Sequence, residues 1–170
     1  MTDPQVFQEV QLNTFSRSRC SPPEPDPRWR GVAIQAPRRV SFQRGIRVGP
    51  SRAFAAIPIC GVYMLDVPYP PVEDVIQLVA VDKRTGRKCG GPVVSVDASP
   101  EEPHPGRRPL REEDVKGLAS GQYFNPNLAD FAGLPEGPGI YDVYAEVRGN
   151  RSNVVTIEVV EGGAPPAPRR

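Results

Sequence analysis

The amino-acid sequence predicts an all-β protein, a sandwich of antiparallel β-sheets. Apolar and polar residues alternate in several short runs, which is the period-two pattern of half-buried strands. The 170 residues include 22 prolines and 16 glycines, a composition that favours turns and loops over helices. Two of the alternating runs flank Gly149-Asn150, a dipeptide typical of tight hairpin turns because both residues tolerate positive φ. We therefore expect residues 139–161 to form a β-hairpin of this fold.

Residues 1–37 are expected to form a Pro-rich N-terminal extension. The run 21–27, SPPEPDP, cannot be helical and favours extended polyproline geometry. The single tryptophan, Trp29, follows this run and is expected to dock onto the domain and cover an apolar patch. One short strand could form from the apolar residues Val6, Phe7, Val10 and Leu12.

The β-sandwich domain is expected to span residues 38–161, followed by a disordered, low-complexity tail at 162–170. Alternation predicts short strands at 40–42 and 46–48. Residues 53–65 are the most apolar stretch of the chain. Proline and glycine interrupt this stretch, so we expect either a strand with a bulge or two short strands.

The second half of the domain begins with a predicted strand pair at 75–81 and 89–96, joined by a polar loop. Residues 97–121 follow as one long, polar, Pro-rich loop, with a possible helical turn around 110–118. Loops of this length are uncommon in compact domains and are often functional or disordered. The apolar spacing in 123–134 predicts an irregular segment or single helical turn that crosses one end of the sandwich.

The last part of the domain resembles a known family. Residues 134–145, LPEGPGIYDVYA, are similar to the turn and penultimate strand of bacterial immunoglobulin-like and fibronectin-like modules, and residues 151–159, RSNVVTIEV, are similar to their last strand. Tyr141 stands where such modules place a tyrosine corner, whose hydroxyl bonds back to the loop backbone. The resemblance implies an immunoglobulin-like β-sandwich. It differs from antibody-type domains because the chain has no Cys…Trp…Cys pattern.

The sequence contains none of the common catalytic or cofactor motifs. Its single histidine, His104, lies beside Glu101 and Glu102, and we interpret it as a solvated loop residue because a metal site would have only one nitrogen ligand. The adjacent carboxylates at 112–114 do not oppose one another as acid–base pairs do. Nucleophile elbow, phosphate loop, dinucleotide fingerprint and calcium loop are all missing from the sequence. We expect no catalytic residues, no metal and no cofactor.

Charge and hydropathy argue against nucleic acid and membrane. The 21 Lys and Arg nearly balance the 20 Asp and Glu, giving a net charge of +1 and no electrostatic footprint for nucleic acid. Arginines grouped with aromatic residues in the first third of the chain are interpreted as a solvent face. No apolar run approaches the ~20 residues of a membrane span. No secretory signal is visible, so we expect a cytoplasmic protein, or an extracytoplasmic one if a signal has been removed.

The three cysteines, Cys20, Cys60 and Cys89, are too few and too widely spaced for a disulfide framework. We expect three separate reduced thiols. Cys60 and Cys89 could pair in an oxidising compartment.

These observations favour a non-enzymatic protein-binding or structural module whose partner and oligomeric state the sequence does not name. Two surfaces could bind: an exposed strand edge, or the loop at 97–121 together with 123–134. The Pro-rich N-terminal extension could also wrap a partner subunit and become ordered on binding. One alternative is an inhibitor or immunity-like protein that blocks an enzyme's cleft with the 97–121 loop. Another is a carbohydrate-binding domain that stacks sugars on aromatic side chains: Trp29, Tyr63, Tyr69, Tyr123 and Tyr144. The candidate residues for partner binding are Trp29, His104, Arg107, Arg108, Tyr123 and Phe124.

Overall fold

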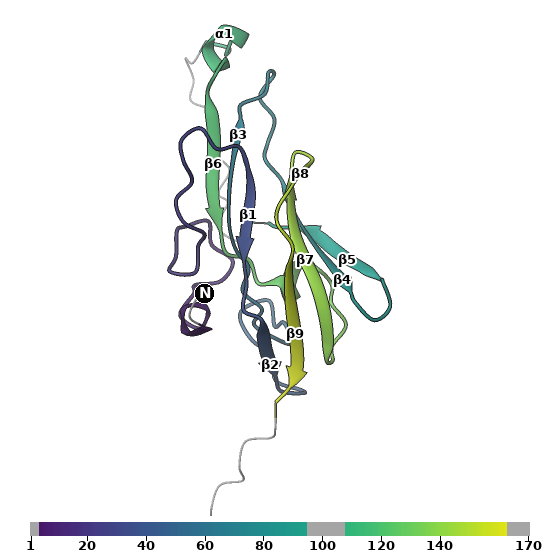
Figure 1. Cartoon of the computed structure of the whole chain (residues 1–170). Helices are drawn as coiled ribbons and strands as arrows, with labels where there is room; N and C mark the ends of the chain where they lie inside the picture. The colour runs from purple at the N-terminus through teal and green to yellow at the C-terminus, as the bar shows by residue number, and fades with distance from the viewer. Residues whose placement is uncertain (1–3, 95–107, 163–170) are drawn as a thin grey trace, which may run out of the picture.

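The protein folds as two β-sheets that enclose one shared core (Figure 1). The computed structural model describes residues 4–94 and 108–162. The smaller sheet has the order β1-β3-β6, and its strand pairs are antiparallel. Its strands are β1 (Gly31–Gln35), β3 (Cys60–Asp66) and β6 (Ala119–Phe124).

The larger sheet has the order β2-β9-β7-β4-β5, with the short strand β8 beside β7. Its pairs are antiparallel except for β2, which runs parallel to β9. The strands are β2 (Arg39–Phe42), β4 (Ile76–Asp82), β5 (Lys88–Pro92), β7 (Gly139–Val147), β8 (Asn150–Arg151) and β9 (Val155–Glu161). Three single-turn helices complete the described elements: η1 (Pro4–Phe7), α1 (Glu112–Val115) and α2 (Leu128–Phe131). The predicted all-β class is confirmed.

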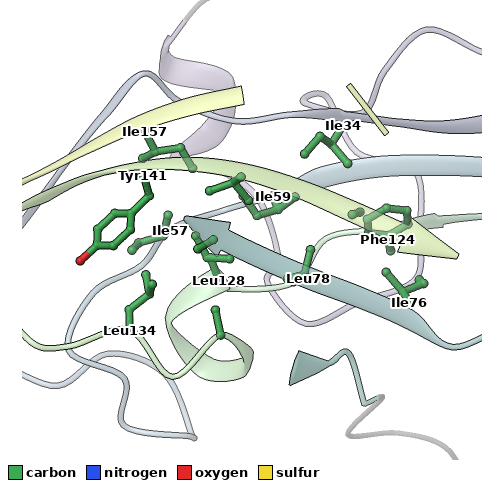
Figure 2. Close-up of a cluster of buried hydrophobic side chains, with 14 of the residues drawn as sticks. Ile34, Ile57, Ile59, Ile76, Leu78, Phe124, Leu128, Leu134, Tyr141 and Ile157 are labelled. Atoms are coloured by element: carbon green, nitrogen blue, oxygen red, sulfur yellow. The ribbon is translucent and has the colours of Figure 1, made fainter. Parts of the chain in front are cut away.

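The core lies between the two sheets, and α2 contributes Leu128 to it (Figure 2). Ile34 and Phe124 enter it from the smaller sheet, Leu78 from the larger sheet, and Leu128 from α2. Burying each such side chain stabilises the fold by roughly 1.5–3 kcal/mol. The Phe124 ring lies directly over Gly61, where any Cβ would collide with it. That contact explains why glycine occupies this position within β3.

The predicted hairpin is confirmed, because β7 and β9 pair antiparallel over Gly139–Val143 and Val155–Val159. The position of its turn was predicted one residue too late. Val147 pairs with Asn150, so the two loop residues are Arg148 and Gly149, with φ of 47° and 76°. Two positive φ values define the type I′ turn that hairpins prefer. Asn150 is instead the first residue of β8, and its amide donates to the carbonyls of Val147 and Arg148.

Tyr141 is buried, with its ring against Gly139 at the start of β7. Burial is the main cause of the raised pKa of its phenol, and the nearby Asp82 carboxylate adds to the effect. Within the described residues its hydroxyl makes no hydrogen bond to backbone. The hydrogen bond that a tyrosine corner requires is therefore not found there.

Most of the other predicted strands form, with shifts at their ends. The pair predicted at 75–81 and 89–96 is β4 and β5, and the strand at 40–42 is β2. Residues 53–65 give a single strand, β3, after an irregular segment. Residues 46–48 form no strand, and Val48 makes only an isolated bridge to Ala53. The predicted helical turns are α1 and α2. Residues 97–121 were expected to form one loop, but the last three of them belong to β6. Residues 97–107 of that stretch lie outside the described residues.

The N-terminal segment is part of the fold, not an appendage to it. β1, within the range 1–37 that we expected to lie outside the sandwich, pairs with β3 along its whole length. The strand expected around Val6 and Phe7 is instead the 3-10 helix η1. Residues 4–23, here called the arm, pack Phe7, Val6 and Val10 around the buried sulfurs of Cys20 and Cys60. The expected tail, apart from Gly162, lies outside the described residues.

Cys20 and Cys60 form a disulfide, which corrects the expectation of three reduced thiols. Cys60 lies on β3, and the chain returns Cys20 to within 5.7 Å of it, Cα to Cα. The partner expected in the alternative pairing, Cys89, lies on β5 of the other sheet and remains a free thiol. Sequence separation could not reveal this, because a disulfide depends on Cα distance and side-chain direction in the folded chain.

No helix among the described residues is long and apolar enough to cross a membrane.

Candidate functional site

The outer edge of β6 presents backbone groups that no described residue satisfies. Backbone bonds from Val67 to Leu118 and from Ile59 to Pro126 continue the β3–β6 ladder beyond both of its ends. Backbone hydrogen bonds form at every second residue of an antiparallel strand, so the even-numbered residues of β6 direct their N–H and C=O groups at β3. Ala119, Gly121 and Tyr123 therefore direct their N–H and C=O groups away from the sheet.

This open stretch of the β6 edge has a defined end on each side. At Asn125 the arm already occupies the edge, since Asn13 N–H donates to the Asn125 carbonyl and Asn125 N–H donates to Thr14. At the other end β6 begins directly after Leu118, and the chain that leads into it comes from α1. Among the described residues, none bonds to the outward groups of the five-residue stretch 119–123.

The opposite edge of the same sheet, at β1, is covered by a side chain. The Asn153 amide accepts from the Ile34 N–H at 2.9 Å and donates to the Ile34 carbonyl at 3.0 Å. It thus makes both bonds that a neighbouring strand would make at this residue. Asn153 lies between β8 and β9, so it also joins the two sheets along this side.

The two edges of the larger sheet carry features that discourage strand addition. On β5 the ladder pattern directs Lys88, Gly90 and Pro92 outward. Proline has no N–H to offer and an edge lysine opposes pairing, both of which are common protections of edge strands. β2 is only four residues long and begins with the exposed Arg39. Of the four edges, β6 has the longest run of available backbone groups.

An open cavity of about 780 Å³ adjoins the β6 edge, between the two sheets. Gln122 of β6 and Tyr63 of β3 line one side of it, and the beginning of β4 and the end of β5 line the other. Its apolar lining comes from Phe15, Val75, Ile76, Pro92, Val93 and Val94, and its acidic groups are Glu73 and Asp74. Phe15 immediately follows the arm residue that bridges Asn125.

Asp74, which lines the cavity, forms an ion pair with Arg148. Arg148 Nε lies 2.6 Å from Asp74 Oδ1, with side chains 17% and 15% exposed. The same guanidinium donates to the Asp66 carbonyl at 2.6 Å, so the β7–β8 turn is tied to both β3 and the β3–β4 connection. Burial, and then the Asp74 carboxylate, raise the pKa of the Tyr63 phenol far above its usual value. Tyr63 is therefore a neutral hydroxyl beside the carboxylate that pairs with Arg148.

The structure describes four of the six residues predicted to contact a partner. Phe124 is completely buried and cannot contact a partner. Tyr123 is partly covered by Arg17, whose guanidinium lies 5.7 Å from the ring centroid. Trp29 is half-buried against Gly31, and Arg108 is exposed and paired with Asp114. His104 and Arg107 lie outside the described residues.

The aromatic side chains considered as sugar platforms are mostly covered. Tyr63 is buried in the wall of the cavity, and the Arg151 guanidinium lies 3.5 Å from the centroid of the buried Tyr144 ring. Of the five, Tyr69 is the most open, at 51% exposed. No pair of these rings forms a stack among the described residues.

Sequence reasoning missed the residues that define this site. Asp74 lay between predicted elements, Phe15 lay in the predicted extension, and Asn153 lay in the segment that resembles a last strand, with no motif at any of the three. Arg148 had a usable signal: a residue directly before Gly, between two alternating runs, can be the first loop residue of a type I′ turn. Metal chemistry has no visible support in residues 4–94 and 108–162, where no three His, Cys, Asp or Glu side chains cluster.

Comparison with known proteins adds little. No family model matches the sequence, and no curated protein is significantly similar to it. One solved structure, the Pseudomonas fluorescens alkylpurine DNA glycosylase AlkC bound to DNA containing an abasic site analog, is similar over 77% of this chain, with 14% identity and a TM-score of 0.35. The alignment covers 31% of that protein, so this chain spans about a third of its length. A TM-score this low does not establish a shared fold.

Proposed function

We propose that this protein is a non-enzymatic binding module that accepts an extended strand of another protein at the β6 edge. The observation that carries the proposal is the run of outward backbone groups at Ala119, Gly121 and Tyr123, which no described residue satisfies. Backbone N–H and C=O groups are strong hydrogen-bonding groups, and the addition of a strand would pair several of them at once. The contrast with the covered β1 edge supports the choice of β6.

The resemblance of residues 134–159 to immunoglobulin-like modules supports an immunoglobulin-like sandwich as the finer description of the two sheets. Edge pairing is a common use of antiparallel sheets. The Cys20–Cys60 disulfide supports an oxidising compartment, since such bonds persist there and are rare in the cytosol. We therefore favour the extracytoplasmic alternative over the cytoplasmic one.

A peptide-display selection on the immobilised full chain tests the proposal. Recovered clones are re-measured against Ala119→Pro, which removes one outward N–H at the first residue of β6. The matched control is Lys88→Pro, which makes the same change at the first residue of β5. Proline is tolerated at such positions, and thermal melting verifies that both variants fold. We expect Ala119→Pro to weaken binding at least tenfold and Lys88→Pro to leave it unchanged. Clones that bind Ala119→Pro as well as the unmodified chain would refute the proposal.

A further inference from the structure

We propose that the occupant of the β6 edge is a short extended peptide segment, about five residues long, that carries an apolar side chain for the adjoining cavity and a basic side chain for Glu73. This inference rests on the proposed function and adds the chemistry of the partner. Its three parts are the length of the segment, its apolar residue and its charge.

The length follows from what bounds the open edge. Pairing is available over residues 119–123, which is roughly 16 Å at about 3.3 Å per residue. Beyond these residues the arm occupies Asn125 at one end, and α1 precedes Leu118 at the other. A second copy of this chain pairing antiparallel about Gly121 would bring its own arm against the α1 end of the first. A bare peptide segment brings no such neighbours.

The apolar residue follows from how the arm uses the same edge. Thr14 bridges Asn125, and the next residue, Phe15, lines the cavity and packs against the main core. An extended chain on this edge therefore places a side chain between the sheets. A peptide strand that pairs with residues 119–123 would lie along the same edge as the arm residues Thr14 and Phe15. Its inward-facing side chains meet Gln122 and the apolar wall that includes Val75 and Val93.

The charge follows from the groups that line the cavity. Asp74 is neutralised by Arg148, whereas Glu73 is exposed and makes no ion pair with any described residue. Tyr63 is neutral. On the other face of β6, Arg17 is already paired with Glu24. Among the described residues that line the cavity, the uncompensated charge is therefore negative, and it favours a basic residue in the same row as the apolar one.

The test uses fluorescein-labelled, end-capped heptapeptides in which four Thr alternate with Val, Val and Lys, titrated with the full chain by fluorescence anisotropy. In one version the Thr backbone nitrogens are methylated, and in another those of the Val and Lys residues are methylated. Only one of the two rows directs its N–H groups at β6, so we expect one version to lose at least tenfold in affinity and the other to keep it. The second comparison replaces Lys by Glu in the peptide and Glu73 by Lys in the protein. We expect the acidic peptide to bind the unmodified chain about two- to fivefold more weakly and to recover on Glu73→Lys, as for an exposed ion pair.

The outcomes separate the two claims. If methylation of one row and Ala119→Pro both abolish binding but the charge swap changes nothing, the basic residue is refuted and edge binding stands. If neither methylation pattern weakens binding, strand addition at β6 is refuted along with the peptide. Absence of binding by all peptides up to ~1 mM would also overturn the inference. If sedimentation shows a dimer that Ala119→Pro dissociates, the occupant is a second copy and the peptide assignment is wrong.

Discussion

The two long sides of the smaller sheet differ in how they end. On the β1 side the Asn153 amide makes both backbone bonds of Ile34 and joins the sheet to the β8–β9 segment. On the β6 side Ala119, Gly121 and Tyr123 keep their outward backbone groups free of any described partner. Both strands pair with β3, so their place in the sheet does not explain the difference.

The comparison shows that a single side chain can satisfy the backbone groups of an edge strand. Where no such side chain is present, the groups stay available for a partner. Asn153 lies opposite Ile34 and takes the place of a neighbouring strand there, because its amide carries both a donor and an acceptor. The β6 edge has small or covered side chains at the same outward positions. Its only intramolecular edge partner within the described residues is the arm, at Asn125.

The largest effect on stability is expected from removing the Cys20–Cys60 disulfide, which links the arm to β3 beside the open edge. Replacing both Cys20 and Cys60 by Ala removes a cross-link between residues 40 apart in sequence, which corresponds to about 4 kcal/mol of unfolding free energy in the chain-entropy model. Denaturant unfolding measures the loss. Released from β3, the arm should also free Asn125, so hydrogen exchange at its amide should rise. The free thiol provides the control: Cys89→Ala should change stability by less than about 1 kcal/mol. Equal losses in both variants would show that the disulfide does not hold the arm.

A smaller loss of unfolding free energy is expected when the Arg148–Asp74 ion pair is broken. Arg148→Ala leaves the Asp74 carboxylate half-buried and unpaired and breaks the bond to the Asp66 carbonyl. We expect a loss of about 2–3 kcal/mol, below the range for fully buried pairs. The exposed pair Arg17–Glu24 supplies the reference, because Arg17→Ala should cost at most about 1 kcal/mol. If the two arginine variants are equally stable, the Arg148 pair does not support the cavity.

Asn153→Ala should convert the closed side into an open one. Two hydrogen bonds to Ile34 are lost, for an expected cost of about 1–2 kcal/mol. Hydrogen exchange at the Ile34 amide should accelerate, while exchange at the inward amides of β6 should not. The variant should also gain a second peptide-binding edge. An unchanged Ile34 exchange rate would mean that another group protects β1.

The smallest effect concerns Tyr63 in the wall of the cavity. Burial first, then Asp74, raise the pKa of Tyr63 in the folded protein. A raised pKa means that the folded state favours the protonated phenol. Its contribution to stability is complete below the unfolded value of about 10 and declines as pH rises above it. Comparing unfolding free energies of the unmodified chain and Tyr63→Phe across alkaline pH checks this. The difference should stay flat below about pH 10 and fall above it. A flat difference throughout would place Tyr63 in solvent.

Several elements could be predicted because their signals are local. The β7–β9 hairpin follows from two alternating runs with a glycine between them, and β4 and β5 follow from β-branched runs around a polar loop. The turn was placed one residue late because Gly149 suits both candidate positions, and the pairing of Val147 with Asn150 decided between them. Phe124 was taken for a surface residue because its contact with Gly61 joins residues far apart in sequence.

By itself the sequence determined the all-β class, most strand positions and the lack of common catalytic motifs, since these depend on periodicity, turn residues and composition. Only the tertiary structure decided that the arm belongs to the fold, that Cys20 pairs with Cys60, and that β1 is closed while β6 is open. Each of these depends on which distant backbone or side-chain groups come within hydrogen-bonding or bonding distance. Local patterns do not encode that distance, and the packing of two sheets around a common core sets it.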